Sequence, residues 1–333
     1  MDRDSYVSIP ATEVPCYDFN LDLPAGKRWK KIFDSFGQDS IDELRYHGSK
    51  MLSTFSSVLV GIKMAINAFP RDKILYIEEL EYIAERCEME LHEVIVLQMV
   101  YEANSMCTSA VYELAGKKYF FRTMDWDTLF LKKYTIRLNV IKNSAVVAEA
   151  VGWLGLVGYF TATCKREKPY SISINFRKTG RGSLLLNAVR VFTGCFPVAY
   201  LLRLIINNPH TVDEAIDRMK EEDLISPAYF IVCDWHGKED CIITRNCDSV
   251  ASVRRVCLTQ ANCDIVRDKE AAGISYISTG DDILHSVWRL KLFEKIKGET
   301  SGDLVDFLKF PILNDETIYV YYMCDGKTLN CLV

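Results

Sequence analysis

A cysteine, an arginine and a carboxylate stand in two adjacent segments that are typical of a β-hairpin. Cys107 opens the run CTSAVYEL, a turn follows at 115–118, and the run YFFRTMDW carries Arg122 and Asp125. A short antiparallel hairpin brings the end of its second strand beside the start of its first. There the arginine could stabilise a thiolate, and the carboxylate could hold an amine or orient the arginine. On spacing alone, the commoner explanation is a cysteine that serves as a small buried apolar residue.

Other classes of site have little support in the sequence. The five histidines show no metal-ligand spacing and no C-x-x-C pair occurs among the twelve cysteines, so we expect no metal and no cofactor. Lys and Arg number 40 against 45 Asp and Glu, a net charge of −5. Such a chain has no basic field for nucleic acid. With 49% hydrophobic and 26% charged residues it is typical of a globular protein.

The first hundred residues are predicted to be helical after an extended lead-in. Ser40 is a candidate N-cap, with Glu43 completing a capping box, for a helix that runs to Phe69. Apolar periodicity predicts two more helices, at 72–87 and 90–101.

From Cys107 onward the pattern changes to strands with helices between them. Strands are expected at 107–114, 119–126, 133–141, 144–153, 170–176, 228–234, 240–245 and 253–260, helices at 184–207, 212–222, 283–297 and 301–308, and a loop at 180–182. Thr211 is expected to begin the second of these helices, and the pair 281–282 the third. This order predicts an α+β layered fold in one compact unit with a helical N-terminal third.

Five blocks of sequence resemble a known family when taken in order. They are VPCYDFNLDLPAGKRW (14–29), CTSAVYELAGKKYFFRTMDW (107–126), GWLGLVGYFTA (152–162), ISPAYFIVCDWHGKEDCIITR (225–245) and LTQANCD (258–264). They resemble blocks of the acid ceramidase and N-acylethanolamine-hydrolysing acid amidase family, with the acid ceramidase branch nearer. These proteins are N-terminal nucleophile hydrolases.

The resemblance implies an αββα sandwich and a precursor that cleaves itself between Met106 and Cys107. Residues 1–106 then form a helical α segment that stays associated with a catalytic β segment, 107–333. The new α-amine of Cys107 serves as the base for its own thiol, since an α-amine has a pKa near 8. The thiol attacks an amide carbonyl, and water releases the fatty acid from the thioester.

By position in the matched blocks, the resemblance also implies roles for single residues. Arg122 lies beside the thiol, Asp125 orients the α-ammonium, and Asn262 donates to the oxyanion. Substrate-binding residues expected in the other blocks are Asn175, Trp153 and Tyr159.

The sequence departs from the family's motifs at two points. Phe176 replaces an acidic residue, and Ile283 stands where the family has an arginine, with Arg289 a poorly aligned substitute. These replacements are compatible with an altered substrate, a slower cleavage, or a relative without activity.

The leading functional hypothesis is hydrolysis of ceramide to a sphingoid base and a fatty acid. Alternatives are hydrolysis of N-acylethanolamines or other N-acyl amines, and an uncleaved relative that binds lipid or a partner without turnover. The apolar stretch 192–202 is interpreted as a buried helix or as a surface that contacts a membrane or lipid aggregate. Because no apolar leader and no N-x-S/T sequon occur, we expect a cytoplasmic protein with a pH optimum near neutrality.

Overall fold

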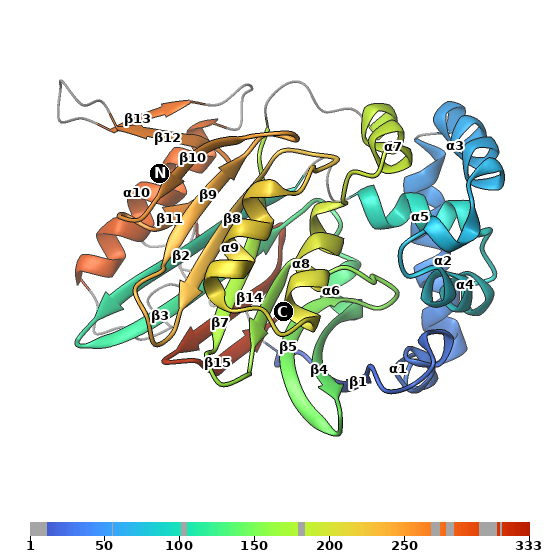
Figure 1. Cartoon of the computed structure of the whole chain (residues 1–333), viewed down its shortest axis with the longest axis horizontal. Helices are drawn as coiled ribbons and strands as arrows, with labels where there is room; N and C mark the ends of the chain where they lie inside the picture. The colour runs from blue at the N-terminus through green and yellow to red at the C-terminus, as the bar shows by residue number, and fades with distance from the viewer. Residues whose placement is uncertain are drawn as a thin grey trace.

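The computed structural model describes residues 12–54, 56–100, 105–178, 184–267, 274–277, 283–299, 312–313 and 315–333. The N-terminal segment is mostly helical and lies to one side of the sheets (Figure 1). Its elements are β1 (Cys16–Asn20), η1 (Ala25–Lys27), α1 (Lys30–Asp34), α2 (Gln38–Ser53), α3 (Ser56–Ala68), η2 (Arg71–Lys73), α4 (Ile77–Arg86) and α5 (Leu91–Val100).

The predicted helices of this segment exist, but two of their boundaries were wrong. The helix expected from Ser40 is two helices, α2 and α3, and the N-cap of α2 is Gly37, without a side-chain cap. The helix expected at 72–87 begins only at Ile77, because Tyr76 before it has a left-handed backbone with φ of 59°. The helix expected at 90–101 is confirmed as α5 over its described residues.

Two β-sheets form the rest of the framework. The eight-stranded sheet has the order β1-β4-β5-β6-β7-β8-β9-β10, and the five-stranded sheet has the order β11-β2-β3-β14-β15. The strands are β2 (Met106–Leu114), β3 (Lys117–Asp125), β4 (Thr135–Lys142), β5 (Ala145–Trp153), β6 (Thr161–Cys164), β7 (Tyr170–Phe176), β8 (Ala228–Asp234), β9 (Cys241–Arg245), β10 (Val250–Arg254), β11 (Thr259–Gln260), β14 (Thr317–Cys324) and β15 (Lys327–Leu332). A separate pair joins β12 (Asp264–Arg267) to β13 (Ile274–Ile277).

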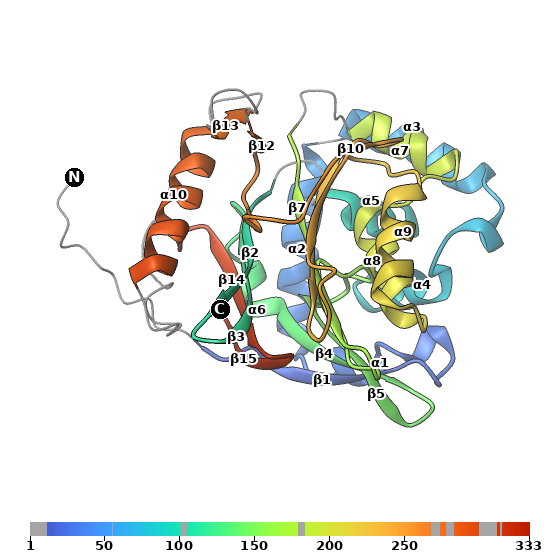
Figure 2. The same ribbon diagram turned by 60° about the vertical axis from the view of Figure 1, so that its left-hand side comes forward.

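The sheets pack face to face, and helices cover both outer faces (Figure 2). Helices α8 (Val198–Asn207) and α9 (Val212–Glu221) lie on the eight-stranded sheet, and α10 (Ile283–Glu299) lies on the five-stranded sheet. Helices α6 (Leu131–Tyr134) and α7 (Leu184–Phe192) lie in connections. The predicted α+β class and αββα layering are confirmed.

The helix expected at 184–207 was wrong, because the chain breaks between α7 and α8. Gly194 has a φ of +93°, which favours glycine, and Pro197 precedes the first residue of α8. Thr211 does begin α9 with a complete capping box. Strands β6, β12, β13, β14 and β15 were not predicted, and the single strand expected at 253–260 was wrong, because that stretch is divided between β10 and β11. The loop predicted at 180–182, the helix start predicted at 281–282 and the helix predicted at 301–308 lie outside the described residues.

A buried ion pair connects the helical segment to the second half of the chain. Glu79 on α4 and Arg203 on α8 are both fully buried, and the two Nη atoms of Arg203 donate to the Glu79 carboxylate at 2.8 and 2.6 Å. Nη1 of Arg28 and Nε1 of Trp29 also donate to this carboxylate, each at 2.9 Å. Burial raises the pKa of Glu79, but Arg203 and these hydrogen bonds outweigh burial and hold the pKa below its usual value.

The first and last described residues pair through their backbones. The Thr12 N–H donates to the Val333 carbonyl at 3.2 Å, and the Val333 N–H donates to the Thr12 carbonyl at 3.0 Å. The segment that begins at Thr12 joins both sheets, because Glu13 pairs with Leu332 of β15 and β1 pairs with β4.

All twelve cysteines are free thiols. In the part of the chain that the structure describes, no helix combines the length and apolar character needed to span a membrane.

Candidate active site

The β2–β3 hairpin brings the predicted chemical residues together. Cys107 lies opposite Met124, Met106 opposite Asp125, and Arg122 opposite Ser109. Side chains alternate between the two faces of a strand. Cys107 and Arg122 therefore share the face toward the eight-stranded sheet, and Asp125 occupies the face toward α10. The hairpin separates a thiol face from an amine face.

On the thiol face, Arg122 is held rigidly beside the nucleophile. Its Nη2 donates to Sγ of Cys107 at 3.2 Å and to the Ile174 carbonyl at 2.9 Å, and its Nη1 donates to the Phe160 carbonyl and to Thr161 Oγ1, both at 2.5 Å. Cys107 and Arg122 are fully buried. A fixed guanidinium at this distance stabilises a thiolate.

Asn175 lies on the same side, next to Ser109. The Ser109 hydroxyl donates to Asn175 Oδ1 at 2.7 Å, and Asn175 Nδ2 donates to the Gln260 carbonyl at 2.9 Å. This side chain thus connects β7 to the five-stranded sheet. Its expected contact with substrate stays a prediction, and Ser109 was not singled out in the sequence.

On the amine face, Asp125 is fully buried in a polar cluster. Its carboxylate accepts from Thr317 Oγ1 at 2.7 Å, from Thr123 Oγ1 at 3.1 Å and from Nη1 of Arg289 at 3.3 Å. Burial raises the pKa of Asp125 above its usual value, although Arg289 and the hydroxyl donors oppose the shift.

Asn262 connects the two faces at the Cys107 backbone. Its Oδ1 accepts from the Cys107 N–H at 2.7 Å and from Nη2 of Arg289 at 3.1 Å. Its Nδ2 donates to the Phe176 carbonyl at 2.8 Å and to the Ser105 carbonyl at 3.4 Å. In this continuous chain Asn262 thus accepts from the nitrogen that would become the α-amine. Its role as an oxyanion donor stays a prediction.

Arg289 is the site residue whose role was predicted least well from the sequence. In α10, Ser286, Arg289, Leu290 and Phe293 are all buried, at helical spacing. A buried charge needs a partner, but the apolar pattern of α10 is too weak to mark position 289 as buried, so the sequence carries no clear signal. Arg289 contacts Asp125, Asn262 and also Thr108 Oγ1, at 2.8 Å.

A second ion pair fixes the loop that carries Asn262. Nε and Nη2 of Arg177 donate to the two carboxylate oxygens of Asp264 at 2.8 and 2.7 Å, and Tyr229 Oη donates to Oδ1 at 2.5 Å. Burial raises the pKa of Asp264, but Arg177 and Tyr229 outweigh burial and lower it. The pair holds the end of β7 against the start of β12.

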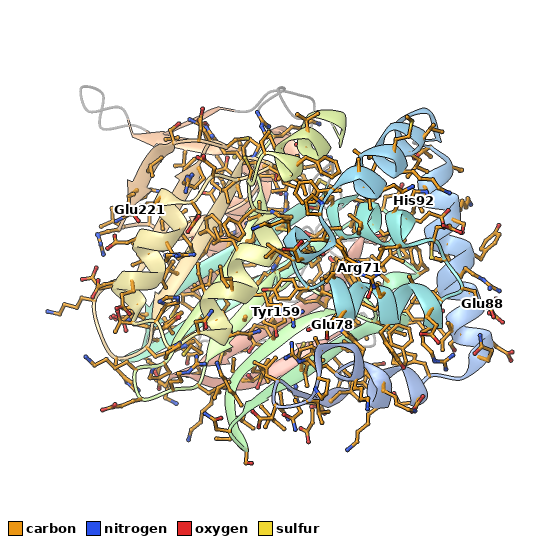
Figure 3. The ribbon with its side chains drawn as sticks, turned by 45° about the vertical axis from the view of Figure 1, so that its right-hand side comes forward. Arg71, Glu78, Glu88, His92, Tyr159 and Glu221 are labelled. Carbon is orange, nitrogen blue, oxygen red and sulfur yellow. The ribbon has the colours of Figure 1, made fainter. Side chains whose placement is uncertain are left out.

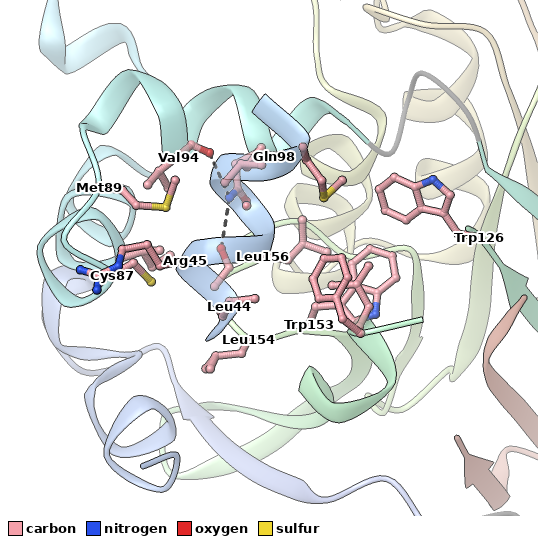
Figure 4. A pocket seen from close by; sticks show the side chains of 17 residues that line it. Leu44, Arg45, Cys87, Met89, Val94, Gln98, Trp126, Trp153, Leu154 and Leu156 are labelled. Atoms are coloured by element: carbon pink, nitrogen blue, oxygen red, sulfur yellow. Dashed lines mark hydrogen bonds between the residues drawn. The ribbon is translucent and has the colours of Figure 1, made fainter. Parts of the chain in front are cut away.

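Trp153 lies in the wall of an apolar cavity of about 100 Å³ (Figure 4). Trp126, directly after Asp125, lines the same cavity, and the two rings have centroids 5.8 Å apart. The ring of Trp153 also packs against the ring of Phe160, with centroids 5.6 Å apart, and the Phe160 backbone carbonyl accepts a hydrogen bond from Arg122. Trp153 thus lines the cavity and packs on Phe160, and its expected contact with substrate stays a prediction.

Tyr159 is grouped differently from the other predicted residues. Its hydroxyl donates to Asn207 at 3.3 Å, its backbone N–H donates to the Ala199 carbonyl, and its ring lies beside Arg203. Figure 3 labels it near the boundary between the N-terminal helices and α8. Tyr159 thus belongs to the packing of α8, and a role in substrate binding stays a prediction.

Comparison with known proteins places the chain in a family. No family model matches it. It is 34% identical over 333 residues to Uncharacterized protein R632 of Acanthamoeba polyphaga mimivirus, covering 96% of this chain and 99% of that protein. It is 28% identical over 253 residues to the acid ceramidase of Heterocephalus glaber, covering 70% of this chain. The chain belongs to the acid ceramidase and N-acylethanolamine-hydrolysing acid amidase family.

A solved structure has a similar fold. The Caenorhabditis elegans N-acylethanolamine-hydrolyzing acid amidase ortholog matches with a TM-score of 0.51 and 24% identity, over 66% of this chain and 94% of the other. The match spans 63% of the Heterocephalus glaber acid ceramidase, just under two thirds. Among the described residues, no group of three or more His, Cys, Asp or Glu could hold a metal ion.

Proposed function

We propose that the chain is an amidohydrolase that cleaves lipid N-acyl amides with Cys107 as its nucleophile. The observation that carries the proposal is the placement of Cys107. Its Sγ accepts from Arg122, while its backbone N–H donates to Asn262 within the Asp125–Arg289 cluster. One residue thus presents its thiol and its nitrogen to two separate polar clusters, as an N-terminal nucleophile requires.

The first reaction is cleavage of the chain before Cys107, between an α segment of 1–106 and a β segment of 107–333. The Cys107 thiolate attacks the Met106 carbonyl, a C–S bond forms, the C–N bond breaks and the nitrogen takes a proton. Water then hydrolyses the thioester. Since Cys107 is fully buried in the continuous chain, cleavage is also the step that opens the thiol to substrate.

In turnover the freed α-amine accepts the thiol proton and later gives it to the leaving amine. Arg122 stabilises the thiolate, and Asp125 with Arg289 orients the ammonium group through Asn262. After cleavage the Nδ2 group of Asn262 becomes a donor for the oxyanion, a contribution of about 3 kcal/mol to the transition state. Attack gives an acyl-thioester and a free amine, and water releases the fatty acid.

Ceramide is the substrate that we propose first, with N-acylethanolamines and other N-acyl amines as the alternative within the same chemistry. Both have an apolar acyl chain, and part of that chain would lie in the apolar cavity walled by Trp126 and Trp153. The head group decides between them, and a panel of lipid amides with one acyl chain and varied head groups measures that choice directly.

Intact-mass analysis after incubation tests the proposal. Fragments corresponding to 1–106 and 107–333, together with release of fatty acid from a fluorogenic N-acyl substrate, are expected. Cys107→Ala, which removes the nucleophile and little volume, is the matched control and should abolish both events while leaving the fold intact. Turnover by this variant would show that Cys107 is not the nucleophile.

An uncleaved, non-catalytic lipid-binding protein is the second candidate. The observation that favours it is Phe176, an apolar residue where the resemblance implies an acidic one. In addition, Asn262 Nδ2 already donates to the backbone carbonyl of residue 176 in the continuous chain. A persistent full-length chain with no release of fatty acid would support it. The cytoplasmic location and the contact with membranes or lipid aggregates stay predictions.

A further inference from the structure

Two apolar cavities share one polar wall residue, Gln98 on α5. The inner cavity, of about 100 Å³, includes Leu97, Trp126 and Trp153 in its lining. The outer cavity, of about 430 Å³, includes Met99 and lies against the α7–α8 connection. Gln98 lines both cavities, so its side chain stands where the two spaces adjoin.

The carboxamide of Gln98 is fixed in this position from both parts of the chain. Its Oε1 accepts from the Val157 N–H at 2.9 Å, and its Nε2 donates to the Gly155 carbonyl at 3.1 Å and the Val94 carbonyl at 3.3 Å. Figure 4 shows this side chain with Trp126 and Trp153 toward the catalytic strands. Gln98 is only 5% exposed. A buried carboxamide with these partners is a costly group to displace.

The inner cavity is the one that lies toward the catalytic strands, because Trp126, which lines it, directly follows Asp125 at the end of β3. A series of contacts runs from Cys107 through Arg122 and Phe160 to Trp153. An alkyl chain that extended from a carbonyl at Cys107 into the inner cavity would meet Gln98 at its far wall. The larger outer cavity lies on the other side of Gln98.

We infer that Gln98 is a specificity-determining residue that limits the length of the acyl chain. This inference rests on the proposed function, because it assumes an acyl group bound for attack by Cys107. Each methylene buried in the inner cavity raises affinity about fourfold. The gain stops at the chain length that reaches Gln98, since the next methylene finds a hydrogen-bonded amide instead of an apolar space.

The test compares N-acyl amides with saturated chains of increasing length and one head group. For the unmodified protein, kcat/KM is expected to rise with each added methylene and then level off. Gln98→Ala joins the two cavities, so the rise should continue past that length, with at least a tenfold gain for the longest chain relative to the shortest. For each variant, the kcat/KM of every substrate is divided by the kcat/KM of the shortest substrate. A general loss of folded protein therefore cancels from the comparison.

Neighbouring residues on the same helix supply matched controls. Leu97→Ala enlarges only the inner cavity and Met99→Ala only the outer one, so both should keep a plateau. A plateau that persists in Gln98→Ala, or that disappears equally in Met99→Ala, would overturn the inference.

A binding experiment separates this inference from the proposed function. Fatty acids of increasing length are titrated into Cys107→Ala and into the double variant that also carries Gln98→Ala. A plateau in the first and its absence in the second would support the length limit even if the unmodified protein cleaves no amide. The same affinity profile in both variants would reject the length limit even if amide hydrolysis is observed.

Discussion

Replacing Glu79 by glutamine tests whether the buried ion pair holds the helical segment to the catalytic sheets. Glu79 lies in the proposed α segment and Arg203 in the proposed β segment, so the pair spans the cleavage site in sequence. Glutamine keeps the shape of the side chain but removes its charge. One of its two polar atoms becomes a donor that faces donors from Arg203, Arg28 or Trp29.

The size of the effect follows from the burial of both partners. Arg203 is fully buried, so Glu79→Gln leaves its charge without a counter-ion in a low-dielectric environment. Breaking one side of such a pair costs about 3–5 kcal/mol. The same free energy corresponds to a rise of about two to four decades in the dissociation constant of the two fragments after cleavage.

Denaturant unfolding of the uncleaved Cys107→Ala chain, with and without Glu79→Gln, measures this cost. Arg28→Met is the matched control, because Arg28 is 21% exposed and supplies one contact to Glu79. Arg28→Met also removes hydrogen bonds to the Leu21 and Leu23 carbonyls, so its cost should be about 1–2 kcal/mol, still below that of Glu79→Gln. If Glu79→Gln costs no more than Arg28→Met, the ion pair does not hold the segments together.

The pH dependence gives an independent check with a defined sign. The folded pKa of Glu79 lies below its ordinary value of 4.5, so its contribution to stability is present above pH 4.5. That contribution is lost as the pH falls through the folded pKa. The stability difference between the parent and Glu79→Gln should therefore be constant near neutrality and should shrink in acid.

Three further predictions concern the catalytic clusters. Arg289→Met should slow self-cleavage about 30- to 150-fold, because it removes from Asp125 a charge-assisted contact worth about 2–3 kcal/mol. The rate is measured by intact mass over time, and a decrease of less than threefold would contradict this prediction. The acidic limb of the pH–rate profile should lie above pH 3.8, because activity requires the Asp125 carboxylate and is lost as the pH falls through a raised pKa; a limb at or below 3.8 would refute the assignment. Arg177→Met should lower kcat about tenfold with little change in KM, because it loosens the loop that carries Asn262, whereas Tyr229→Phe should lower kcat less than threefold. Steady-state kinetics on one substrate compare Arg177→Met with Tyr229→Phe. An equal loss of kcat in the two variants would contradict the role of Arg177 in positioning the Asn262 loop.

The sequence was most informative where neighbouring residues determine structure. The hairpin pattern around Cys107 predicted the strand pairing and thus the approach of Arg122, because register follows from two adjacent strands and a short turn. Thr211 predicted the start of α9 for the same reason, since a capping box is a local device.

Contacts between distant elements could not be read from local patterns. The break between α7 and α8 follows from the packing of two separate helices, although Gly194 and Pro197 were visible as signals. The division of Cys107 and Asp125 between two faces was implicit in strand alternation. The identity of Arg289 as the partner of Asp125 depends on how α10 lies across the five-stranded sheet, and no spacing in the sequence reports that arrangement.

The backbone pairing of Thr12 with Val333 allows the order of the chain to be changed. Because these residues are hydrogen-bonded to each other, a short linker could join 333 to 12, and the chain could instead begin at Cys107 and end at 106. After removal of the initiator methionine, such a circular permutant would carry the nucleophile as its first residue without self-cleavage between 106 and 107. The permutant would therefore allow amide hydrolysis to be measured independently of self-cleavage before Cys107. In the natural order of segments, hydrolysis depends on that cleavage.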